Sequence, residues 1–186
     1  MQLLRVVVLL ALAALLGACG SMNVVSEGAD SRLMLKGYDP VSYFIQGGKP
    51  TPGRPDLKAE HDGVTYRFMS EETRKIFVAN PARFAPQFGG FCANGMVYAI
   101  PNGGEPLNYK LINGKLYVFG GERSKLFFEM DQERNLKLAE GYWASEVKDS
   151  NWRVQSWKRV FLDKVPHYKT NAELAAEYER RTGKKL

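Results

Sequence analysis

The residue best able to do chemistry in this chain is a single cysteine far from the N-terminus. Cys92 lies in the segment PQFGGFCANG, behind two glycines and an aromatic residue, and the only other cysteine of the 186 residues is Cys19, in an apolar leader. A thiolate can serve as a metal ligand or as a nucleophile. Both roles require neighbouring side chains, so the question is which residues the fold brings to Cys92.

His61 and Met69 are the first candidates for a shared metal site with Cys92. Thiolate, imidazole and thioether form a soft ligand set, which favours copper, especially Cu(I), over zinc, magnesium or calcium. Met96 and His167 are weaker candidates. The sequence therefore predicts a soft-metal site from Cys92, His61 and Met69, on the condition that the three side chains converge.

Two other interpretations of Cys92 stay open. A free cysteine is most often a small, inert, buried side chain. Thiol redox chemistry usually relies on a Cys-x-x-Cys pair, and the sequence has none. It also lacks a Gly-x-Ser-x-Gly nucleophile elbow and a Gly-x-x-x-x-Gly-Lys phosphate loop. We therefore expect a binding protein and not an enzyme.

Two predicted β-hairpins would position these residues. Alternating residues 57–61 and 64–68 flank Asp-Gly, and residues 107–112 and 115–119 flank Asn-Gly. Both dipeptides are strong signals for tight hairpin turns. His61 would then lie at the tip of the first hairpin, where a solvent-exposed histidine beside Asp62 is also an ordinary finding.

Helix signals occupy most of the remaining chain. Ser70 is a predicted N-cap followed by two acidic residues. We further expect a short helix from Pro40, a strand over 97–100 and a mostly helical segment over 122–142. Near the C-terminus, two more helices are expected, one from Trp152 and one that Gly183 ends.

The leader predicts export and lipid attachment. Arg5 precedes an apolar run over 6–16 that is too short to cross a bilayer comfortably and is typical of a signal peptide. The run ends in Leu-Gly-Ala-Cys, which resembles a bacterial lipobox and implies a signal peptide over 1–18 with a lipid on Cys19. Gly20 in place of aspartate favours the outer membrane, with the protein on the periplasmic side. Residues 19–31 are small and polar, and we expect a flexible tether.

Positive charge is concentrated in the last part of the chain. Residues 19–147 hold fifteen Lys and Arg against fifteen Asp and Glu, whereas residues 148–186 hold ten against five. A solvated helical tail and contact with a protein or an anionic lipid surface are both compatible with this basic extension. Its first helix has an apolar stripe that either packs back on the domain or meets a partner or the membrane. Nucleic acid is not an expected partner behind a signal peptide.

Four segments in order resemble the YHS domain family, and in particular its exported bacterial members. These are GYDPVSYF (37–44), HDGVTYRFMSEETRKIF (61–77), NPARFAPQFGGFCANG (80–95) and INGKLYVF (112–119). The resemblance implies an α+β fold, a small domain of β-hairpins packed on helices over 32–147, with a helical C-terminal extension over 148–186.

The resemblance also bears on metal binding. Related domains in metal transporters are taken to bind metal through cysteines, and the matching positions here are Ser42, Met69 and Thr73. That cysteine site therefore cannot be carried over, while Cys92 belongs to an element of the exported branch. The expected function is a lipid-anchored periplasmic binding protein with copper as the most concrete candidate ligand. The alternative is a structural or protein-interaction lipoprotein with an inert Cys92.

Overall fold

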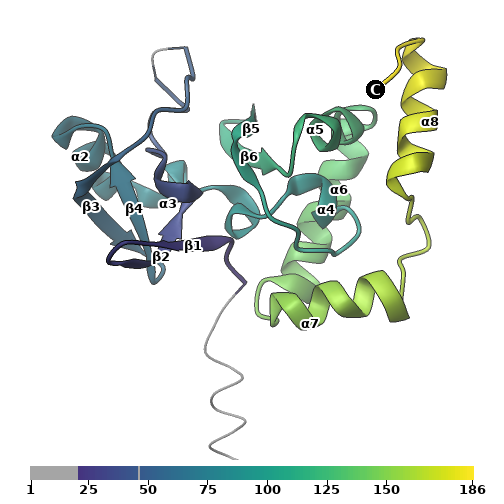
Figure 1. Ribbon diagram of the computed structural model, residues 1–186, viewed down its shortest axis with the longest axis horizontal. Coiled ribbons are helices and arrows are strands. Elements are labelled where there is room, and N and C mark those ends of the chain that lie inside the picture. Colours follow the sequence, from purple (N-terminus) through teal and green to yellow (C-terminus); the bar gives the residue numbers. More distant parts are fainter. Residues whose placement is uncertain (1–20, 46) are drawn as a thin grey trace, which may run out of the picture.

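The computed structural model describes residues 21–45 and 47–186 and contains two sheets with helices around the second (Figure 1). The predicted signal peptide and the lipid-attachment residue Cys19 lie outside the described residues. The fold is α+β, as predicted. None of the helices in the described ranges is long and apolar enough to cross a membrane.

The first sheet has four strands in the order β1-β2-β4-β3. β1 and β2 pair antiparallel, as do β3 and β4, whereas β2 and β4 run parallel. The predicted Asp-Gly hairpin is confirmed: Asp62 and Gly63 both have positive φ, as a tight hairpin turn requires. The strands are β1 Val24–Glu27, β2 Asp30–Met34, β3 Arg54–His61 and β4 Val64–Phe68.

Helix α2, Glu71–Ala79, covers this sheet. Its N-cap is Ser70, as predicted, and Thr73 completes a reciprocal capping box that satisfies backbone N–H groups of the first turn. Phe77 packs its ring against Tyr66 and Phe68 of β4, with centroids 4.6 and 5.2 Å apart. The short helices η1 Leu35–Gly37 and α3 Pro81–Phe84 flank this part of the chain.

The second hairpin separates two hydrophobic clusters. Strands β5, Glu105–Ile112, and β6, Lys115–Phe119, pair antiparallel around the predicted Asn-Gly turn. Alternate residues of β6 face opposite sides, so that Leu116 contributes to the cluster under the first sheet and Tyr117 to the cluster among the helices. This explains why the strand is buried on both faces.

The helices of the second half surround the other cluster. The segment 122–142 is mostly helical, as predicted, and is divided into two helices at Asp131, whose backbone has left the helical region. The elements are η2 Gln87–Gly90, α4 Ala93–Met96, α5 Glu122–Glu129, α6 Gln132–Tyr142, η3 Trp143–Val147, α7 Trp152–Trp157, η4 Lys158–Leu162 and α8 Asn171–Thr182.

Three local predictions are wrong. The predicted tether over 19–31 is folded in its described part, because strand β1 and the start of β2 lie within it and Ser21 is buried. The segment after Pro40 forms turns and not a helix. Residues 97–100 form a turn after α4 in place of a strand, and Ala99 has a φ of +56° that ends regular structure there.

The C-terminal extension is part of the same folded unit. Val165 and Leu174 are buried in the cluster that also contains Cys92, with Tyr168 packed against it. Asn151 caps α7, and Thr170 and Gly183 bound α8 as predicted. Residue 148 is therefore not a structural boundary between a domain and a tail.

Candidate functional site

Cys92 is held by a tight loop at the centre of the molecule. The loop contains consecutive residues with positive φ, Phe88 at +55° and Gly89 at +55°. The Cys92 N–H then donates to the carbonyl of Asn102 at 2.8 Å, and Cys92 forms a bridge with Val118 of β6. These contacts place the thiol, which is 3% exposed, at the start of α4.

The double glycine of the motif lets the N-terminal segment cross this loop. A Cβ at Gly89 would lie 2.5 Å from the carbonyl oxygen of Ser21 and 2.9 Å from the sulfur of Met22. Asn23 secures the crossing: its N–H donates to Gly89 O at 2.8 Å and its side-chain amide to Gly90 O at 2.8 Å. The glycines are thus required by close backbone approach and need no ligand to explain them.

The Cys92 thiol is held in its neutral form. Burial raises the pKa of Cys92 above its ordinary value because a thiolate would lose its hydration. The backbone N–H groups of Gly95, Gly120 and Asn94, and the Ser124 hydroxyl, act in the opposite direction but do not outweigh burial. A neutral thiol is a poor nucleophile and a poor metal ligand.

A cleft of about 250 Å³ opens beside Cys92. One wall belongs to the Cys92 loop and the residues around α4 and β6, and the other to the C-terminal extension. The cleft is therefore assembled from segments distant in the sequence. Its lining residues include Asn94, Tyr98, Ile100, Asn102, Ser124, Val160, Tyr168, Lys169, Asn171 and Leu174.

Asn94 is a mostly buried polar residue of this cleft whose side chain has no partner in the described chain. It is only 7% exposed, and its side-chain amide makes no hydrogen bond with any residue of the described ranges. Its amide atoms are not among the fully buried unpaired atoms of the described chain, so they are accessible from the cleft and free to bond to a molecule there. Because Asn94 lines the cleft, this hydrogen-bonding capacity is directed at whatever occupies it.

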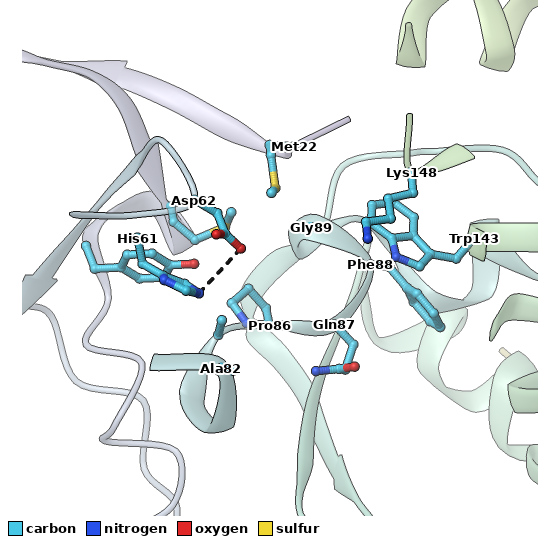
Figure 2. A pocket seen from close by; sticks show the side chains of 13 residues that line it. Met22, His61, Asp62, Ala82, Pro86, Gln87, Phe88, Gly89, Trp143 and Lys148 are labelled. Carbon is cyan, nitrogen blue, oxygen red and sulfur yellow. Dashed lines mark ion pairs between the residues drawn. The ribbon is translucent and has the colours of Figure 1, made fainter. Parts of the chain in front are cut away.

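His61 lies in a different cavity, of about 230 Å³, shown in Figure 2. Its Nε2 is 3.4 Å from the Asp62 carboxylate, and its ring packs edge-on against Phe77. His61 and Asp62 form one side of the cavity, and Trp143 and Lys148 form the other (Figure 2). Cys92 does not line this cavity.

Met69 lies at the far end of strand β4 from His61. The register places His61 opposite Val64, and Met69 directly follows the last residue of the strand. Five residue steps of about 3.3 Å separate the two ends by about 16 Å. Ligand atoms of one metal ion lie only about 2.0–2.3 Å from the metal, so His61 and Met69 cannot share one.

The predicted site of Cys92, His61 and Met69 is therefore not formed. Cys92 and His61 line different cavities, and Met69 is remote from His61. Within residues 21–45 and 47–186 there is also no group of three or more His, Cys, Asp or Glu side chains placed to hold a metal ion. The sequence suggested these ligands by their chemistry, and the strand register separates them.

The three positions that the sequence resemblance matched with cysteines, Ser42, Met69 and Thr73, take part in local hydrogen bonds. The Ser42 hydroxyl donates to the carbonyl of Asp39 at 2.7 Å, and the Met69 N–H donates to the Asp39 carboxylate at 2.9 Å. Thr73 is occupied in the capping box with Ser70. The polar groups at these positions are thus engaged in local structure.

His167 attaches the extension to the domain. Its Nε2 lies 2.9 Å from the carbonyl of Val97, and its ring stacks between Tyr98 and Tyr142 at interplanar angles of 29° and 24°. This is a structural role. Asn94 could not be predicted as a site residue from the sequence. An asparagine carries no signal by itself, and the cleft that it lines is formed only when the C-terminal extension packs against the Cys92 loop.

Comparison of the chain with family models, with curated proteins and with solved structures returned no match. Function must therefore be inferred from the geometry of the chain itself.

Proposed function

We propose that this chain is a lipid-anchored periplasmic binding protein that holds a small polar molecule in the cleft beside Cys92. The observation that carries the proposal is Asn94, a residue only 7% exposed whose amide has no partner in the described chain and is accessible from a cleft of molecular size. Concave sites with a few convergent polar groups are the usual form of small-molecule sites.

The lining indicates the chemical class of the ligand. Polar groups come from Asn94, Ser124, Asn102 and Asn171, and no carboxylate is among the lining residues. Lys169 also lines the cleft, with its ammonium paired to the carboxylate of Glu177. Ile100, Tyr98, Val160 and Leu174 add apolar and aromatic surface. These features favour a molecule of amino-acid size with a carboxylate or amide group and a small apolar part.

Binding is favoured over catalysis by the state of the thiol. The raised pKa of Cys92 keeps it protonated, and neither His61 nor His167 lines the cleft to act as a base. The protein would thus be a binding protein of the YHS type and not an enzyme. In this proposal Cys92 is a buried thiol that forms part of the cleft wall. The proposal does not include copper coordination by Cys92, His61 and Met69.

The experiment is isothermal titration of the detergent-solubilised protein with free amino acids, short-chain carboxylates and their primary amides. The expected result is saturable binding of at least one of these probes. Asn94→Leu removes the amide at similar volume and should weaken binding about tenfold or more, the equivalent of about 1.4 kcal/mol. Asn108→Leu, on strand β5 away from the cleft, is the matched control and should bind as the natural chain does. Absence of binding across all probes, or equal affinity in Asn94→Leu, would contradict the proposal.

A further inference from the structure

The segment formed by α7 and η4 buries polar side chains and exposes apolar ones, the opposite of a typical surface helix. A surface helix normally buries its apolar face and exposes its polar one. Here Gln155 and Arg159 are buried, at 7% and 8% exposure. The residues that face outward are apolar, and we call them the outer apolar face: Val154, Trp157, Phe161 and Leu162, each more than half exposed.

Polar contacts fix this orientation. The Gln155 amide donates to the carbonyl of Ala99 at 3.3 Å, and the Arg159 guanidinium pairs with the carboxylates of Glu146 and Asp163. Turning the helix to bury its apolar side would break the bond of Gln155 to Ala99 and separate the Arg159 charge from Glu146. The outer apolar face is therefore held outward by the fold.

The composition of this face matches a membrane interface. The rings of Trp157 and Phe161 lie together, with centroids 6.4 Å apart, and the exposed basic residues Arg153 and Lys158 lie on the same segment. Helices that lie in the plane of the interface combine aromatic and aliphatic residues with Lys and Arg, which attract anionic lipids.

The described chain begins beside the loop that leads into α7. The Ser21 N–H donates to Lys148 O at 3.1 Å and its hydroxyl to Ser150 O at 2.7 Å, just before α7 begins. Figure 1 shows the start of β1 beside the chain that leads into α7. Cys19 precedes Ser21 by two residues, a stretch that spans at most about 7 Å.

From these observations we infer that the outer apolar face inserts into the bilayer interface beside the lipid on Cys19. The inference rests on the lipid anchoring in the proposed function and adds to it a second contact and a defined orientation. Several acyl chains on one modified cysteine already give stable attachment, so what the face adds is orientation. The face would thus fix which side of the protein meets the membrane.

The test uses the chain expressed with its own leader and reconstituted into vesicles of phosphatidylethanolamine and phosphatidylglycerol. Brominated acyl chains quench tryptophans that reach the interface, and Trp157→Phe isolates the contribution of Trp157 from those of Trp143 and Trp152. Phe161→Ser should reduce the quenching of Trp157 severalfold. Leu107→Ser, at an equally exposed apolar residue on β5, is the matched control and should leave the quenching unchanged.

Lipid attachment is measured separately by the mass of the intact protein. A lipidated protein whose Trp157 is not quenched would overturn the inference and leave the anchor intact. A protein without lipid whose Trp157 is still quenched by added vesicles would overturn the anchor and support the face. Cross-linked dimers that are lost in Trp157→Ser, without any quenching by bromolipid, would assign the face to a second copy and also overturn the inference.

Discussion

The backbone N–H of Met69 donates a hydrogen bond of 2.9 Å to the buried carboxylate of Asp39. The other carboxylate oxygen accepts from the N–H of Val41 at 2.8 Å. Asp39 thereby joins the loop of the first motif to the end of β4, and the segment Asp-Pro-Val has a structural purpose independent of metal.

Replacing Asp39 with alanine should destabilise the fold strongly. Two buried N–H groups would lose their acceptor, which is expected to lower the free energy of unfolding by about 2–4 kcal/mol. Urea denaturation followed by circular dichroism measures this change. Asp56→Ala removes an exposed carboxylate paired with Arg54 and should have a much smaller effect, because solvent screens exposed ion pairs. Equal effects of the two substitutions would contradict the role given to Asp39.

Acid should weaken the first sheet through Asp30. Its hydrogen bond to Lys58, with a smaller contribution from Arg67, lowers the pKa of Asp30 below the usual value. A carboxyl group with a lowered folded-state pKa stabilises the protein above its unfolded pKa of about 3.9 and loses that contribution as the pH falls through the folded value.

The corresponding measurement is the urea midpoint as a function of pH. The natural chain should lose stability as the pH drops below about 4. Asp30→Asn should be less stable at pH 7 and should show a shallower decline over the same acid range. If the two curves ran parallel down to the lowest pH, the ion pairs of Asp30 would not be responsible.

Alkylation of Cys92 should be slow near neutral pH. The thiol is 3% exposed and its pKa is raised by burial, so both access and thiolate population are low. Iodoacetamide labelling followed by mass spectrometry should give a labelling rate that rises only at a pH above the usual pKa of a free cysteine. In urea, where the thiol is exposed, labelling should be complete. Rapid and saturable labelling at pH 7 would instead reveal an accessible thiolate.

Copper should not be bound jointly by the residues that the sequence suggested. The register of β3 and β4 separates His61 from Met69, and Cys92 lines another cavity. In competition with a chromophoric Cu(I) chelator, His61→Ala, Met69→Leu and Cys92→Ser should each retain the Cu(I) affinity of the natural chain. A loss of stoichiometric binding in all three variants would show that the side chains converge after all.

Local signals in the sequence predicted much of the fold. Asp62-Gly63 and Asn113-Gly114 have the positive φ that their hairpins require, and Ser70, Asn151 and Thr170 cap the helices that they precede. These features depend on a few neighbouring residues, which a sequence displays directly.

Long-range contacts account for what the sequence could not show. The small polar residues after Cys19 were expected to form a tether, but Ser21 and Asn23 pair with backbone groups that are more than sixty residues away. The apolar stripe of α7 was compatible with packing against the domain or with an outside surface. Its direction depends on Gln155 and Arg159 finding partners on Ala99 and Glu146.

The most direct measurement of the central claim is the amide spectrum of the ¹⁵N-labelled protein during titration with the tightest-binding carboxylate or amide probe. The side-chain amide of Asn94 should shift, together with the backbone signals of Gly95 and Gly120 beside Cys92 and of Asn171 on the extension. Shifts confined to residues of the other cavity, such as His61 and Trp143, with Asn94 unmoved at saturation, would contradict the assignment of the cleft as the binding site.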